Sequence, residues 1–192
     1  MRSLSELVRH GFQKHAENNP QTAPPSPTRE EVLNYLGQLA SDYHIPPKVV
    51  YALADAESSL HVKEKHVNPE RRGKQGNVTR PETTDYGLMG INSSNIGSPV
   101  KGAGERPFKI GEDVKTDWRA NARAGVALFT PGYRLAELEQ GPGATVEDHA
   151  QQAYSQYNSG SPRMRDRYLK QRKDGLPQDG VDRNFLQKFR KW

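Results

Sequence analysis

Segments with helical periodicity on both sides of a helix-poor stretch constrain the fold of this chain more than any other feature. A capping-box sequence at 28–31 opens one helix, and two prolines precede a second helix that we expect over 47–60. Between 61 and 114, glycines, prolines and charges are frequent, which predicts loops with small hairpins. Helical spacing returns at 118–129 and at 145–157. The pattern therefore predicts an α+β chain that is mostly α-helical.

Composition excludes several classes of protein. With 33% hydrophobic residues among 192, the chain has enough apolar side chains for one globular core. It has no cysteine, so disulfides, catalytic thiols and thiolate metal sites are excluded. The spacing of its histidines matches no metal-binding motif, so we expect no metal site. No apolar run is long enough to cross a membrane.

Two boundaries divide the chain. Residues 3–17 have amphipathic spacing and are followed by the proline-rich segment NNPQTAPPSP, so 1–27 is interpreted as an N-terminal arm with a linker. Residues 28–192 form the expected domain, and its C-terminal extension, 163–192, has ten Lys or Arg against four Asp or Glu. Such an extension suits an anionic partner or is an ordinary solvated helix face. We expect its last aromatic residues to pack back onto the body.

Glu57 stands out because it is a carboxylate on the apolar face of the second helix. Val49, Leu53 and Glu57 are spaced by four residues and share one side of that helix. Desolvation and the negative end of the helix dipole both raise the pKa of a carboxyl group in such a place. A carboxylic acid that stays protonated near neutral pH is a suitable general acid. The alternative is a glutamate at the helix edge that reaches solvent.

Two further stretches combine unusual residues. In TTDYGLMGINSSN, at 83–95, Gly87 and Gly90 permit positive φ or a close approach of the main chain to another group, such as a sugar chain. In AYSQYNSG, at 153–160, Tyr157 and Asn158 stand at an expected helix end. A buried turn and a helix stop are the simpler explanations of these stretches.

Taken together, the three features resemble the Slt-type lytic transglycosylases, most closely in motif those of secretion systems and phage virions. The matching pieces are Glu57-Ser58, Asp85 to Met89, Ile91-Asn92, Asn121 to Gly125 and Tyr157-Asn158-x-Gly160, within residues 30–162. The run TDYG followed by INS also resembles c-type lysozyme. The resemblance implies a lysozyme-like fold, with a helical lobe and a small loop and hairpin lobe flanking the cleft.

The resemblance also implies roles for individual residues. Glu57 would be the single catalytic acid and base that cuts between N-acetylmuramic acid and N-acetylglucosamine, forming a 1,6-anhydro sugar without metal or cofactor. Tyr157 would orient Glu57. The expected substrate-binding residues are Ser58, Tyr86, Gly87, Met89, Asn92 and Asn158, with Met89 as a wall of the cleft. Gly90 stands where the family usually has a substrate-binding glutamine, which puts one saccharide subsite in question.

Asp85, the third catalytic candidate, separates two chemistries. A retaining hydrolase needs a second carboxylate about 5 Å from the acid. Asp85 in the cleft would allow a lysozyme-type hydrolase, whereas Asp85 capping a turn beside Tyr86 would leave the transglycosylase, which we favour. A third alternative is a non-catalytic module that binds cell wall or nucleic acid through the basic extension. The presence of Glu57 argues against that alternative.

The implied substrate, peptidoglycan, places the activity in the periplasm or cell wall. The N-terminus shows no secretory signal peptide, so we expect delivery by a secretion system, a phage particle or a holin. The N-terminal arm is the candidate docking segment for such a carrier. The expected partners are glycan strands and a secretion-machine, virion or immunity protein. We expect a monomer without a nucleic-acid partner.

Overall fold

The first helices begin where the sequence predicts, at a capping box and at a proline pair. In α2 (Arg29–Asp42), the backbone N–H of Glu31 donates to Thr28 Oγ1 at 3.2 Å, and the Glu31 carboxylate accepts from the backbone N–H of Thr28 at 2.7 Å. Helix α3 (Pro47–Ser58) ends in two left-handed residues, Ser59 and Leu60, with φ of 53° and 66°. The computed structural model describes residues 26–101, 106–159, 166, 170 and 180–192.

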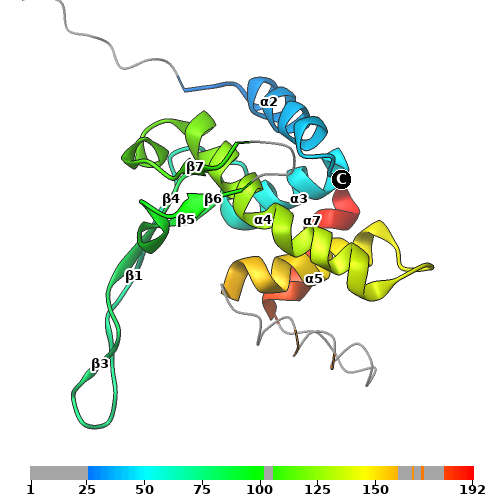
Figure 1. Ribbon diagram of the computed structural model, residues 1–192. Helices are drawn as coiled ribbons and strands as arrows, with labels where there is room; N and C mark the ends of the chain where they lie inside the picture. Colours follow the sequence, from blue (N-terminus) through cyan, green and yellow to red (C-terminus); the bar gives the residue numbers. More distant parts are fainter. Residues whose placement is uncertain (1–25, 102–105, 160–165, 167–169, 171–179) are drawn as a thin grey trace, which may run out of the picture.

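The helical lobe also contains α4 (Trp118–Gln140), α5 (Val146–Ser159) and α7 (Gly180–Lys191). Helix α4 packs along α5, and α7 packs against α3 and α5 (Figure 1). Their apolar faces meet in one core, whose largest fully buried side chains include Leu36, Tyr43, Leu53, Leu88, Met89, Phe129, Tyr133 and Phe185. The loop that contributes Leu88 and Met89 joins two strands of the smaller lobe, so the core fixes this loop against the helices.

The smaller lobe consists of short antiparallel strands. One sheet has the order β1-β4-β5, from β1 (Lys65–Asn68), β4 (Thr83–Tyr86) and β5 (Ile91–Asn92). Two further antiparallel pairs are formed by β2 (Arg71–Arg72) with β3 (Val78–Arg80) and by β6 (Pro99–Val100) with β7 (Phe108–Lys109). The lobe also contains two short 3-10 helices, η1 (Ser93–Asn95) and η2 (Glu112–Lys115). In the three-stranded sheet, Asp85 lies opposite His66 on one side and Asn92 on the other.

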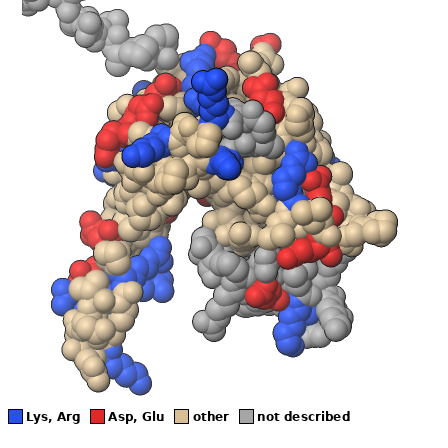
Figure 2. All heavy atoms as spheres, viewed as in Figure 1, with Lys and Arg blue, Asp and Glu red and all other residues tan. Residues whose placement is uncertain are grey.

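An arm built from β1 to β4 extends away from the helical lobe (Figure 1). Its tip carries exposed basic side chains from Arg71, Arg72, Lys74 and Arg80. Figure 2 shows basic side chains on this arm and a recess between the arm and the helical body.

The structure confirms the mostly helical α+β class and the hairpins predicted between 61 and 114. It also confirms that the last aromatic residues pack onto the body, since Phe185 and Phe189 are buried. The predicted N-terminal amphipathic helix lies outside the described residues. No helix in the described part of the chain is long and apolar enough to span a membrane.

Candidate active site

Glu57 lies in the last turn of α3, where the helix meets the loop between β4 and β5. Its Oε1 atom is buried and has no hydrogen-bond partner among the described residues. The pKa of Glu57 is raised from 4.5 to about 7, because burial and, to a smaller extent, the negative charge of Asp85 outweigh a hydrogen bond with the Tyr154 side chain that lowers it. A carboxyl group with this pKa is about half protonated at neutral pH, so a large fraction of the molecules can donate a proton.

Two tyrosines of α5 lie next to Glu57, and their hydroxyl groups form hydrogen bonds with different partners. The Tyr154 side chain makes the hydrogen bond with the Glu57 carboxyl group. The Tyr157 hydroxyl donates to the backbone carbonyl of Met89 at 2.6 Å, and burial together with the charge of Glu57 raises the pKa of Tyr157 well above its usual value. Tyr157 therefore fixes the loop beside the acid, and Tyr154 contacts the acid itself. Sequence reasoning missed Tyr154, although its position three residues before Tyr157 puts both on one helix face.

Asp85 is held by two amide side chains from the neighbouring strands. Asn68 Nδ2 donates to Asp85 Oδ2 at 2.8 Å, and Asn92 Nδ2 donates to Asp85 Oδ1 at 2.7 Å. Asp85 lies inside β4 and its carboxylate bridges the three strands, so it does not cap a turn beside Tyr86. Its charge acts on Glu57 from the sheet side of the site. Asn68 was not predicted, because only the strand register brings it next to Asp85.

The loop from Tyr86 to Gly90 is anchored by one buried amide. Asn121 Nδ2 donates to the Tyr86 carbonyl at 2.7 Å, and Asn121 Oδ1 accepts from the Met89 N–H at 2.8 Å. Gly87 has φ +70°, and a Cβ there would lie 2.5 Å from Asn121 Nδ2. Only glycine therefore allows the main chain to approach this anchor. The sequence matched Asn121 to a family motif without assigning it a role.

Gly90 is small because the acid lies directly against it. Its φ is +57°, and a Cβ at this position would lie 2.5 Å from Glu57 Oε2. The space that a glutamine side chain would begin to fill is thus occupied by the carboxyl group of Glu57. A side chain at position 90 would therefore require the Glu57 carboxyl group to move.

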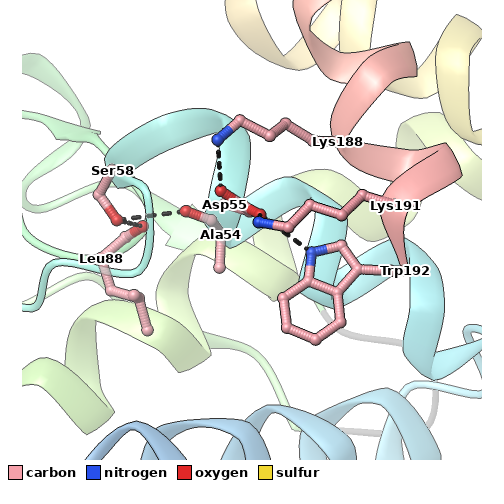
Figure 3. A network of polar contacts seen from close by, with 7 residues as sticks. All are labelled: Ala54, Asp55, Ser58, Leu88, Lys188, Lys191 and Trp192. Carbon is pink, nitrogen blue, oxygen red and sulfur yellow. Dashed lines mark hydrogen bonds and ion pairs between the residues drawn. The ribbon is translucent and has the colours of Figure 1, made fainter.

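The remaining predicted site residues lie around this centre at different depths. Ser58 is buried, and its hydroxyl donates to the Leu88 carbonyl at 2.9 Å (Figure 3), which ties the end of α3 to the loop. The Met89 side chain is fully buried beneath the loop. Tyr86 is half-buried, and Asn158 is exposed at the end of α5. Asn92 joins Asp85 to η1, because its Oδ1 also accepts from the Ser94 N–H at 3.0 Å.

A buried acid at the junction of a helical lobe and a small sheet defines a lysozyme-like enzyme. A family model described as "Transglycosylase SLT domain" matches residues 34–178, most of the chain. The chain therefore belongs to this family, the lytic transglycosylases of the lysozyme-like superfamily, which act on peptidoglycan. Comparisons with curated proteins and with solved structures gave no significant match.

The family match confirms the predicted resemblance, the lysozyme-like fold and the enzyme class. It also agrees with peptidoglycan as the substrate. An enzyme of this family is not a non-catalytic binding module, so the third alternative drawn from the sequence is set aside. Among the described residues, no group of three or more His, Asp or Glu could hold a metal ion.

Proposed function

We propose that the protein is a muramidase in which Glu57 alone carries both proton transfers of a lytic transglycosylase. The observation that supports this most strongly is the buried Glu57 carboxyl group, whose pKa is raised to about 7 and whose Oε1 has no protein partner among the described residues. A group that donates and then accepts a proton works best when its pKa lies near the working pH.

The proposed reaction needs no water. Protonated Glu57 gives its proton to the oxygen that links N-acetylmuramic acid to N-acetylglucosamine, and the bond from that oxygen to C1 breaks. The resulting Glu57 carboxylate takes the proton of the C6 hydroxyl of the muramic sugar, and the C6 oxygen closes onto C1. The products are a 1,6-anhydro-muramic end and a free N-acetylglucosamine hydroxyl, and Glu57 is protonated again.

Asp85 supports a second candidate, a hydrolase that uses both carboxyl groups. The amides of Asn68 and Asn92 hold its carboxyl group by hydrogen bonds, and its negative charge raises the pKa of Glu57. A charged carboxylate on the sheet side would stabilise a positive oxocarbenium-like sugar in either reaction. The hydrolase requires Asp85 as nucleophile, whereas the transglycosylase uses it only for electrostatic support. Transglycosylation is our first choice because of the family match.

Digestion of purified peptidoglycan with mass measurement of the products tests both candidates. The transglycosylase gives products that are one water lighter than those of a hydrolase. Glu57→Gln removes the proton donor with little change in shape, so we expect no products of either mass. A fully active Glu57→Gln protein would overturn the assignment of the acid. Loss of all activity in Asp85→Asn, together with heavier products in the unaltered protein, would establish the hydrolase instead.

We further propose that the enzyme is bacteriolytic and reaches the wall by a secretion system, a phage particle or a holin, with residues 1–27 as a docking arm. The amphipathic spacing at 3–17 and the proline-rich linker after it support this role. Deletion of residues 1–27 should leave activity on purified peptidoglycan intact. Loss of activity on purified peptidoglycan after the deletion would contradict a role limited to delivery.

A further inference from the structure

Helix α7 lies beyond the residues that the family model matches, yet it packs directly behind the site. The match ends at residue 178, and α7 spans Gly180–Lys191. The helix contacts both α3 and α5, the two helices that bring Glu57 and Tyr154 together (Figure 1). Phe185 and Phe189 are buried in this contact. The predicted basic extension is therefore, in its described helix, part of the protein core.

The contact of α7 with α3 centres on a buried carboxylate, Asp55, two residues before Glu57. Asp55 is only 3% exposed, and it accepts from Lys188 Nζ at 2.6 Å and from Trp192 Nε1 at 3.1 Å (Figure 3). Lys191 Nζ lies 3.4 Å from Oδ2, the oxygen that also accepts from Trp192. A buried charge that loses its partners is strongly destabilising. The last turns of α3 therefore depend on α7 to satisfy Asp55.

The contact of α7 with α5 lies against the tyrosine that touches the acid. The ring of Phe185 stacks on the ring of Tyr154, with centroids 4.3 Å apart and planes 13° apart. Since Tyr154 is the hydrogen-bond partner of Glu57, the stacking restricts the position from which this hydrogen bond is made. Helix α7 thus contacts the supports of Glu57 on two sides, through Asp55 and through Tyr154.

We propose that α7 positions the Glu57 carboxyl group, through the Asp55 ion pair on α3 and the Phe185–Tyr154 stack on α5. The inference rests on the proposed function of Glu57. Lys188 and Phe185 are positioning residues, because each acts on Glu57 through another side chain. Because Lys188 and Phe185 make contacts inside the protein, α7 is not simply a solvated helix, although its last turn contains basic residues.

Kinetics on soluble, uncrosslinked glycan strands test the Asp55 ion pair. Lys188→Met removes the ammonium group and keeps the length of the side chain. We expect kcat to fall by about tenfold or more with KM unchanged, since small displacements of a catalytic group have effects of this size. Lys188→Arg keeps the positive charge, so its kcat should be close to that of the unaltered protein.

Arg190→Met is the matched control. Arg190 is also on α7, and its Nη2 forms an ion pair with Glu147 Oε1 at 2.9 Å on the surface of α5, away from Asp55. We expect kcat near that of the unaltered protein. Equal effects of Lys188→Met and Arg190→Met on kcat, or no effect of either, would overturn the proposal.

Phe185→Leu tests the second contact and remains informative if Lys188→Met does not fold. Because the Tyr154 hydrogen bond lowers the pKa of Glu57, its weakening should move the alkaline limb of the pH–activity profile to higher pH. The other groups that face Glu57, Asp85 on β4 and Tyr157 on α5, are unchanged in this variant. An unshifted alkaline limb in folded Phe185→Leu protein would contradict the positioning role. Activity that persists in Glu57→Gln would instead refute the proposed function itself, whatever the α7 variants do.

Discussion

Glu57→Gln should stabilise the folded protein in a pH-dependent way. The rise in the pKa of Glu57 from 4.5 to about 7 means that folding disfavours its charged form by about 3 kcal/mol. Below pH 4.5 the carboxyl group is protonated in both the folded and the unfolded chain, so no penalty applies. The penalty grows as the pH rises from 4.5 and is complete above a pH of about 7. Glutamine carries no charge and has no such penalty.

Urea unfolding of both proteins, followed by circular dichroism, measures this difference at several pH values. The free energy of unfolding of Glu57→Gln minus that of the unaltered protein should increase by about 3 kcal/mol between acidic pH and pH 8. Titrating groups that do not interact with Glu57 contribute equally to both proteins and cancel. Glu82→Gln, at an exposed position on the arm, is the control for the loss of a carboxyl group that is not buried. A difference for Glu57→Gln that stays constant with pH would refute the argument that burial makes this group an acid.

Three further predictions concern the neighbours of the acid. Asp85→Asn removes a negative charge that raises the pKa of Glu57, so the alkaline limb of the pH profile of kcat/KM should move below a pH of about 7. Gly90→Ala should lower stability by about 1–2 kcal/mol because of its positive φ, and should also reduce turnover because its Cβ meets Glu57. Gly76→Ala, with φ +77° and nothing within 4 Å, should show only the stability loss. Asn121→Ala leaves buried loop groups unpaired and should cost about 2–4 kcal/mol in urea unfolding, with loss of activity.

Local signals in the sequence were sufficient for the starts of α2 and α3 and for the position of Glu57 on the apolar face of its helix. The capping box at Thr28 and the proline pair before α3 specify helix starts through contacts within a few residues. The four-residue spacing that ends at Glu57 placed this carboxylate on the buried face without any tertiary information. These features depend on neighbours along the chain, and sequence patterns report such neighbours directly.

The partners of the site residues could not be predicted in the same way. Asn68 reaches Asp85 through strand register, across 17 positions, and Asn121 reaches the Met89 N–H across 32. Lys188 reaches Asp55 across 133 positions. No periodicity encodes contacts of this kind, since they arise only when the core has formed. Gly90 shows the intermediate case: its departure from the family pattern was visible in the sequence, whereas its contact with Glu57 was not.

Asp55 and Glu57 show how one helix shifts the pKa values of two carboxyl groups in opposite directions. Burial opposes the charge of each group. At Asp55, the hydrogen bond and charge of Lys188, with Trp192 and Lys191, overcome this effect and hold its pKa below the usual value. At Glu57, the described residues supply one hydrogen bond from Tyr154 and the negative charge of Asp85, so its pKa rises to about 7. Since burial is common to both positions, the partners and not burial alone decide which carboxyl group of α3 can donate a proton.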